Sequence, residues 1–173
     1  SIKWGYQRQF EKGKVYAANM YGYKSNRGTL DIIEEEAEVV REIFSKYLSG
    51  MSESKIARYL TENKVPKKNG STKWDSGTIG RMLQNEKYSG DALLKKTFNI
   101  DFLHKKRYKN EGQKKMYFVE NSHPAIVTKE VFKAAQVERT KRNMKSNDEK
   151  EAVESHYQNR YSSKNPLSNK IIC

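Results

Sequence analysis

Residues Ser52 to Gly90 decide the fold, and they read SESKIARYLTENKVPKKNGSTKWDSGTIGRMLQNEKYSG. The pattern predicts two short helices around a basic connection that contains glycine, with a Tyr and a Gly leading into a strand. In the first helix, Ile56, Ala57 and Leu60 follow steps of one and three residues, which place side chains on one helical face. This face is expected to form part of the core.

Capping and breaking residues mark the limits of the first helix. Ser52 suits its N-cap, because a serine hydroxyl accepts a hydrogen bond from a backbone N–H that the helix leaves unpaired. Asn63 is the expected stop, and Pro66 cannot continue a helix because it lacks a backbone N–H. The first helix is therefore predicted to lie between Ser52 and Asn63.

The second helix is expected to present a polar outer face. Its cap is Asp75 or Ser76, and its buried stripe is Ile79, Met82 and Leu83. The residues that face outward are Ser76, Thr78, Arg81, Gln84 and Asn85. Arginine pairs with guanine edges, and Gln or Asn pairs with adenine edges. Two small helices of this kind are typical of a helix-turn-helix reader of DNA, and an ordinary helical hairpin with a solvated face is the alternative.

The composition favours polyanionic partners. The 173 residues include 34 Lys and Arg against 21 Asp and Glu, a formal charge of +13, and only 35% are apolar. This balance says nothing about the fold. No run of about 18 apolar residues occurs, which excludes a membrane span, and the start SIKWGYQRQF lacks the apolar region of a signal peptide. Cys173 is the single cysteine, so an internal disulfide is impossible and we expect a cytoplasmic protein.

The residues before this stretch predict a helix, a hairpin and a longer helix. Residues 1–12 place apolar side chains four apart on one stripe. Residues 13–33 begin irregularly, with Lys12 and Lys14 suited to phosphate contacts or to a solvated loop, and then form a small hairpin that starts at Tyr-Gly-Tyr. Residues 34–49 form a helix whose acidic first turn suits the helix dipole better than a metal site. Its expected core residues are Ala37, Val40, Ile43, Phe44, Tyr47 and Leu48.

Two strands around a basic excursion are expected after Gly90. Residues 91–102 alternate roughly as a strand and residues 116–120 form a second one, which predicts an antiparallel hairpin with a basic tip. The basic residues of this tip are Lys105, Lys106, Arg107, Lys109, Lys114 and Lys115. The connection between the two helices carries Lys64, Lys67, Lys68 and Lys73. Two basic protrusions beside the predicted recognition helix indicate a DNA footprint.

The last third of the chain predicts a long helix followed by a change of composition. Thr128 caps a helix over 128–145. Its expected apolar contacts are Val131, Phe132, Ala135 and Val137. Residues 146–161 are polar with mixed charge, and they form either a linker or an extension of the helix. Residues 162–173 then become apolar.

No catalytic motif is present. His104, His123 and His156 share no HExxH or comparable spacing, and no CxxC, GxSxG or GxxxxGK[ST] motif occurs. His123 precedes Pro124 without another ligand at a suitable spacing, so we expect a structural role for it. The sequence therefore predicts no covalent chemistry and no cofactor for this chain.

Several of these motifs together resemble the recombinase domain of large serine recombinases. The likeness rests on Tyr21-Gly22-Tyr23, the acidic-headed helix after it, SxxxIAxxLxxxxVP, KWxxxTIxxxLxN, Tyr88-x-Gly90 and His123-Pro124-Ala125-Ile126-Val127. It extends roughly over residues 2–145. The resemblance implies an α+β, mainly helical fold: a helix-turn-helix-containing recombinase domain with a small β-hairpin element and a long C-terminal helix.

The resemblance also implies a domain organisation. Residues 1–12 would end the linker helix from a catalytic domain that this chain lacks, and residues 13–145 would form the DNA-binding domain. Residues 146–161 would be the linker or helix extension, and residues 162–173 would begin a zinc ribbon with Cys173 as the first of four ligands. The family's nucleophilic serine lies in the missing domain, so this chain would be no enzyme and zinc would belong to the parent.

The implied function is sequence-specific double-stranded DNA binding at an attachment half-site, within a parent that cuts and rejoins DNA. Residues around 12–20 would cross or enter the minor groove, while the helix after Trp74 would lie in the major groove. The expected DNA contacts are Lys12, Lys14, Lys67, Lys68, Lys73, Ser76, Thr78, Arg81, Gln84, Asn85, Lys105, Lys106 and Arg107. Trp74 and Tyr88 are expected as core anchors, and Asn85 alternatively caps the helix end.

The resemblance further implies a monomer without DNA, a parent dimer on DNA and a tetramer in synapsis. A winged-helix transcription regulator is an alternative function. A basic protein-interaction domain that meets an acidic partner is another.

Overall fold

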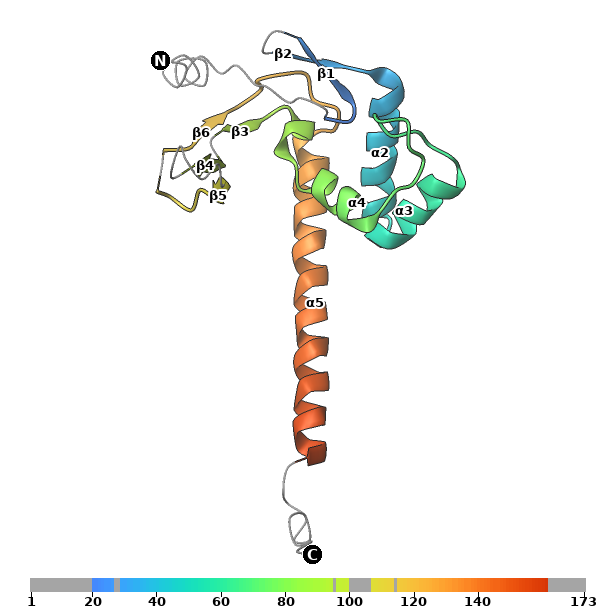
Figure 1. Cartoon of the computed structure of the whole chain (residues 1–173), viewed down its shortest axis with the longest axis vertical. Coiled ribbons are helices and arrows are strands. Elements are labelled where there is room, and N and C mark those ends of the chain that lie inside the picture. Colours follow the sequence, from blue (N-terminus) through green and yellow to red (C-terminus); the bar gives the residue numbers. More distant parts are fainter. Residues whose placement is uncertain (1–19, 27–28, 95, 100–106, 114, 162–173) are drawn as a thin grey trace, which may run out of the picture. The chain divides into compact units, whose positions relative to one another are not determined.

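The computed structural model describes residues 20–26, 29–94, 96–99, 107–113 and 115–161 (Figure 1). The expected helix over 1–12 and the expected zinc-ribbon start over 162–173 lie outside the described residues. So do Lys12, Lys14, Lys105, Lys106 and Cys173. The chain divides into two units, residues 1–136 and 137–173.

Short helices and small antiparallel strand pairs make up the described part of the first unit. The strands are β1 (Tyr23–Asn26), β2 (Thr29–Ile32), β3 (Ala92–Leu94), β4 (Thr97–Asn99), β5 (Arg107–Lys109) and β6 (Tyr117–Val119). The short helices are α2 (Glu34–Leu48), α3 (Glu53–Glu62), α4 (Ser76–Leu83) and the 3-10 helix η1 (Glu86–Ser89). A long helix, α5 (Lys129–Tyr161), begins in this unit and extends into the second. The expected α+β, mainly helical fold class is confirmed.

The Tyr-Gly-Tyr motif begins the hairpin of β1 and β2, as the sequence predicts. Tyr23 pairs with Ile32 and Asn26 pairs with Thr29 across an antiparallel ladder. Gly22 has φ +87°, a conformation that glycine adopts without the steric cost of a Cβ atom. Its N–H donates to Glu36 Oε2 at 2.7 Å, so one carboxylate of the acidic first turn of α2 fixes the hairpin.

A buried aromatic cluster lies beneath this hairpin. The Tyr23 ring stacks on Tyr88 with 6.1 Å between centroids and meets His123 edge-on at 5.2 Å. The Tyr23 hydroxyl donates to the Pro124 carbonyl at 2.8 Å, and burial raises the pKa of Tyr23 to about 12. The expected role of Tyr88 as a core anchor is therefore confirmed.

His123 is structural, as predicted, and it belongs to this same cluster. Its Nδ1 lies 2.7 Å from the Ser122 hydroxyl and its Nε2 lies 2.5 Å from the Lys87 carbonyl. A neutral ring with its proton on Nε2 satisfies both contacts, because the carbonyl can only accept. Burial lowers the pKa of His123, which agrees with a neutral ring.

Helix α2 supplies much of the core. Ala37, Val40, Ile43 and Phe44 have no exposed surface. Leu48, which was predicted to join them, is 38% exposed. It follows the buried Tyr47 directly, and a single step along a helix turns the side chain by about a quarter of a circle toward solvent.

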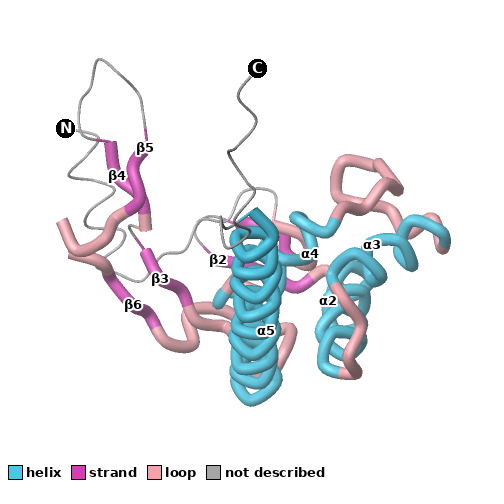
Figure 2. The backbone as a smooth tube through the Cα atoms, turned by 90° about the horizontal axis from the view of Figure 1, so that it is seen from below, coloured by secondary structure: helices cyan, strands magenta, loops and turns pink. Residues whose placement is uncertain are grey.

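The predicted single strand over 91–102 is wrong, because two separate strands occupy the described part of this range. β3 pairs with β6 through Leu93 and Phe118, which confirms the predicted hairpin between the two ranges. β4 instead pairs with β5, inside the range expected to be an irregular basic excursion. Figure 2 shows the two ladders as distinct pairs. Lys95 and Lys96 interrupt the apolar alternation after Leu94, and this is where one ladder ends and the other begins.

Helix α5 begins among the residues of the first unit and continues into the second as far as Tyr161. Thr128 Oγ1 accepts from the Val131 N–H at 3.3 Å, which confirms its predicted capping role. Ala135 is buried, and Val131 and Phe132 pack against the core as expected. Val137 was predicted as an apolar contact, but it is 50% exposed. The backbone of residues 146–161 is helical, so the extension alternative describes it.

Candidate nucleic-acid interface

Helices α3 and α4 pack closely against each other. A Cβ atom added at Gly80 of α4 would lie 2.8 Å from Glu53 Oε2 of α3, so the absence of a side chain at Gly80 permits the approach. Helix α3 also contacts α2 (Figure 1). Ser52 caps α3 and Asn63 ends it, as predicted. The predicted pair of short helices is therefore present, and α2 and α4 both lie against α3.

Helix α4 divides into a buried face and an exposed face. Ile79, Met82 and Leu83 are buried, as their spacing predicts. Ser76, Arg81 and Gln84 are exposed, and Thr78 is half-buried. Asp75, one of the two expected caps, accepts from the Thr78 N–H through Oδ1 at 2.8 Å. The structure thereby selects Asp75 over Ser76.

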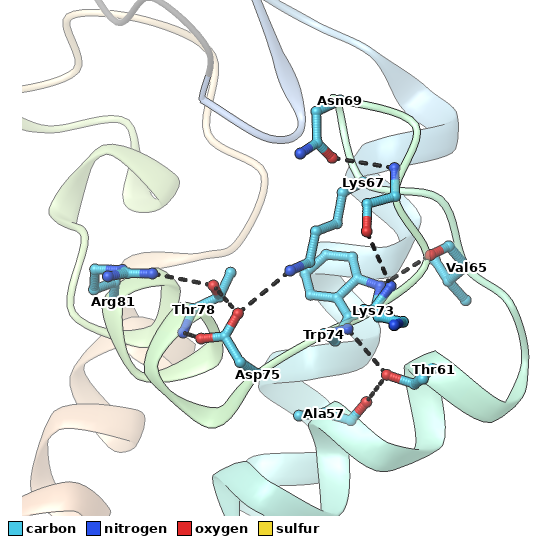
Figure 3. A network of polar contacts seen from close by, with 11 residues as sticks. Ala57, Thr61, Val65, Lys67, Asn69, Lys73, Trp74, Asp75, Thr78 and Arg81 are labelled. Carbon is cyan, nitrogen blue, oxygen red and sulfur yellow. Dashed lines mark hydrogen bonds and ion pairs between the residues drawn. The ribbon is translucent and has the colours of Figure 1, made fainter.

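Trp74 anchors the connection between α3 and α4. Its indole Nε1 donates to the Val65 carbonyl at 2.9 Å, and its backbone N–H donates to Thr61 Oγ1 at 3.0 Å (Figure 3). The ring meets Tyr21 edge-on at 5.3 Å and is only 8% exposed. The expected role of Trp74 as a core anchor is confirmed, and it fixes where α4 begins.

A chain of polar contacts runs from the connection onto the exposed face of α4 (Figure 3). Lys67 Nζ lies 3.3 Å from Asp75 Oδ2. Thr78 Oγ1 donates to the same Oδ2 at 2.7 Å and accepts from Arg81 Nη2 at 3.1 Å. Four side chains near the predicted reading face are thus joined in one network, which we call the α4 polar chain: Lys67, Asp75, Thr78 and Arg81.

The Asp75 carboxyl is ionised throughout the ordinary pH range. The two hydrogen bonds from Thr78 are the main cause that lowers its pKa to about 2, and Lys67 contributes less. Sequence reasoning treated Asp75 only as a cap and missed its place in this network. The sequence pattern that indicates this network is an N-cap aspartate followed three residues later by a threonine. That threonine offers the aspartate both a backbone N–H and a hydroxyl.

Two of the predicted DNA-contacting lysines make internal contacts. Lys68 Nζ donates to the carbonyls of Met20, at 2.9 Å, and of Tyr23. Lys67 is largely covered and lies near the Asp75 carboxylate. Lys68 is nevertheless exposed as a residue, and so is Lys73, for which no contact with a carbonyl or carboxylate of the described residues is seen. The ammonium groups of Lys67 and Lys68 therefore already have partners within the fold.

The amides at the end of α4 are also engaged within the fold. Gln84 Nε2 donates to the Gly80 carbonyl at 2.8 Å. The Asn85 side chain accepts from the Lys87 N–H at 3.3 Å and caps the start of η1. The expected alternative, a cap at the end of α4, is wrong, because Gln84 is the C-cap of that helix. The side chain of Arg107 is not among those described, although its backbone forms part of β5.

Replacing Asp75 by alanine is expected to lower the free energy of unfolding by about 1 kcal/mol near neutral pH, because the N-cap is lost. Asp75→Asn should retain nearly all stability, since Asn caps as well as Asp. The pKa of the carboxyl is lowered on folding, so its ionic contribution is present above about pH 4 and declines as the pH falls toward 2. This contribution is small because the carboxylate is exposed. Urea denaturation of both variants at pH 7 tests the cap, and an equal loss of stability for both would contradict it. The same measurement below pH 4 tests the ionic contribution.

Other kinds of site find little support in the described residues. No group of three or more His, Cys, Asp or Glu side chains among them could hold a metal ion. No helix in the described ranges combines the length and apolar character needed to cross a membrane.

Comparison with known proteins gives a consistent result. The family model described as Recombinase matches residues 34–142. A Bacillus subtilis (strain 168) protein named "Putative DNA recombinase" is 32% identical over 95 residues, which is 50% of this chain and 19% of that protein. The chain thus spans about a fifth of the length of this relative.

Two solved structures have a similar fold. One is described as "Crystal Structure of a LSR-DNA Complex"; the likeness has a TM-score of 0.55 at 20% identity and covers 81% of this chain and 38% of the other. The second comes from work on the sequence requirements of the Listeria innocua prophage attP site. Its TM-score is 0.51 at 18% identity, with 80% of this chain and 51% of the other covered. At such identities the likeness concerns the fold.

Proposed function

The chain belongs to the Recombinase family, as the recombinase domain of a large serine recombinase, and on that premise we propose that it binds double-stranded DNA sequence-specifically at an attachment half-site. Helix α4 would lie in the major groove and read base edges. One of the two solved structures with a similar fold is described as a complex with DNA, which supports the proposal.

The two-faced character of α4 is the observation that carries the proposal. Its apolar face is buried against the rest of the unit, while Ser76 and Arg81 remain exposed on the other face. A short helix held on the protein by one face can present the other to the major groove, which is wide enough to admit it. Arg81 is the best candidate for direct readout, because its guanidinium can bond a guanine in two places.

Contacts to the phosphate backbone would come mainly from lysines. Lys73 is exposed beside α4 and suits this role. From the sequence we propose the same role for Lys12, Lys14, Lys105, Lys106 and Arg107. The net charge of +13 would draw the chain to DNA, with an affinity that decreases as salt rises.

The whole protein would be a site-specific recombinase that cuts and rejoins DNA in the cytoplasm. The resemblance to large serine recombinases supports this proposal. The nucleophilic serine of that family lies in another domain, so the chain itself would catalyse no reaction. Cys173 would be the first zinc ligand of a ribbon in the parent. The chain would be monomeric without DNA, whereas the parent would dimerise on DNA and form a tetramer in synapsis.

Selection from a random duplex library at about 0.15 M salt tests the proposal, because non-specific binding is weak under this condition. Enrichment of a motif of half-site length is the expected result. Binding without enrichment would contradict sequence readout by α4. Absence of binding to any duplex, even at low salt, would contradict DNA binding altogether and favour an acidic protein partner.

Arg81→Ala is expected to cost about 1–3 kcal/mol of binding free energy at one base position of the selected site. Binding to random DNA should change little, because the lost contact is to a base. Fluorescence anisotropy with the selected site and with single-base variants of it measures the difference. Lys73→Ala serves as the matched control, since it should weaken binding to both sequences alike and reduce the salt dependence. An equal loss on both DNAs for Arg81→Ala would argue against a base contact.

A further inference from the structure

The Thr78 hydroxyl lies between a carboxylate and a guanidinium. Its Oγ1 is 2.7 Å from Asp75 Oδ2 and 3.1 Å from Arg81 Nη2 (Figure 3). A hydroxyl has one proton, an ionised carboxylate only accepts, and a guanidinium only donates. The directions of both bonds are therefore fixed: Thr78 donates to Asp75 and accepts from Arg81.

The two oxygens of Asp75 have separable roles. Oδ1 accepts from the Thr78 N–H at 2.8 Å and caps α4. Oδ2 accepts from the Thr78 hydroxyl and from Lys67 Nζ. Asparagine at this position would keep the capping oxygen but present an NH₂ donor in place of Oδ2. The cap would survive, while the bond between residue 75 and the Thr78 hydroxyl would reverse its direction. The hydroxyl proton would then no longer be held away from Arg81, and Lys67 would lose its acceptor Oδ2.

We infer that Thr78 is a positioning residue for Arg81, and that the Asp75 carboxylate, by binding the hydroxyl proton, orients the lone pairs of Thr78 Oγ1 toward the guanidinium. This inference rests on the proposed function, because it assigns Arg81 as the side chain that reads a base. The contact from Thr78 holds the guanidinium over the first turns of α4, the part of a recognition helix that meets base edges. A side chain ordered before binding loses less conformational freedom on the DNA.

The alternative role for Thr78 is purely structural, as part of the cap. Its N–H alone performs that role, and every residue except proline supplies one. Thr78→Val removes the hydroxyl and keeps the shape, whereas Thr78→Ser keeps the hydroxyl. Asp75→Asn replaces the acceptor of the Thr78 hydroxyl by a donor without removing the cap. These three variants therefore separate positioning from folding.

The test uses the whole 173-residue chain and the duplex selected above. Arg81→Ala first identifies the base pair that this side chain distinguishes. The readout is then the affinity for the selected site divided by the affinity for a site altered at that one base pair. Thr78→Val and Asp75→Asn are expected to lower this ratio by roughly three- to tenfold, part of the discrimination that one bidentate base contact supplies. Thr78→Ser should retain it. The melting temperature should stay near that of the unaltered chain.

A double variant identifies the route of the effect. Thr78→Val combined with Arg81→Ala should discriminate no worse than Arg81→Ala alone, because Thr78 acts through Arg81. Unchanged discrimination in both Thr78→Val and Asp75→Asn, with loss in Arg81→Ala, would overturn the inference and leave the proposed function standing. Stronger discrimination in Thr78→Val would also overturn it, since Thr78 would then restrain Arg81 away from the base. No sequence preference in the unaltered chain would overturn both.

Discussion

Replacing Gly22 by alanine is expected to lower the free energy of unfolding by about 3 kcal/mol, the sum of backbone strain and overpacking. Gly22 has φ +87°. An added Cβ would lie 2.7 Å from Ile126 Cδ1 and 3.3 Å from Val40 Cγ2, and both side chains are buried. These atoms have no solvent to move into, so the hairpin or the core must shift.

Urea denaturation of the variant and the unaltered chain measures this loss. Gly70→Ala is the matched control, because Gly70 has φ +79° but no atom lies within 4 Å of its added Cβ. The control should lose only the strain, about 1–2 kcal/mol. If Gly22→Ala were no more harmful than Gly70→Ala, the close packing under the Tyr-Gly-Tyr turn would be contradicted.

Replacing Trp74 by alanine is expected to cost about 3–5 kcal/mol, the usual range for removing a buried aromatic side chain. The indole packs edge-on against Tyr21 and donates to the Val65 carbonyl. Its loss would leave a cavity between the hairpin turn and the connection before α4. Because Trp74 directly precedes the Asp75 cap, DNA affinity should decrease together with stability.

Trp74→Phe separates packing from hydrogen bonding. The phenyl ring retains most of the apolar contact but leaves the Val65 carbonyl without its indole partner, so a loss of about 1–3 kcal/mol is expected. Thermal melting followed by circular dichroism gives the order of the two variants. Equal stability of Trp74→Ala and the unaltered chain would contradict the anchoring role.

Periodicity and capping predicted the helical part of the fold well. The buried positions of α3 and α4 follow from the spacing of Ile56, Leu60, Ile79 and Leu83, because helix geometry alone determines which side chains share a face. The caps Ser52 and Thr128 were predictable for the same reason, since they depend only on residues three places away.

Features that depend on distant partners were not predictable from spacing. Strand β4 pairs with β5, whereas β3 pairs with β6. The residue pattern of these short strands does not determine which strand is the partner. Lys68 looked like a phosphate contact, but its ammonium is bound by carbonyls of Met20 and Tyr23, more than forty positions earlier in the chain. In the candidate site, local sequence revealed the polar face of α4. The contact between Lys67 and Asp75 depends on the path of the connection, and local sequence did not reveal it.

The bond from the Tyr23 hydroxyl to the Pro124 carbonyl has a kinetic consequence. It joins residues 101 positions apart, and Ile126 covers the turn at Gly22 in the same place. Closing so long a loop costs entropy that helix formation does not, and a high contact order slows folding. The hairpin of β1 and β2 is synthesised before the residues around Ile126, so it gains these stabilising contacts only after a further hundred residues have been added to the chain.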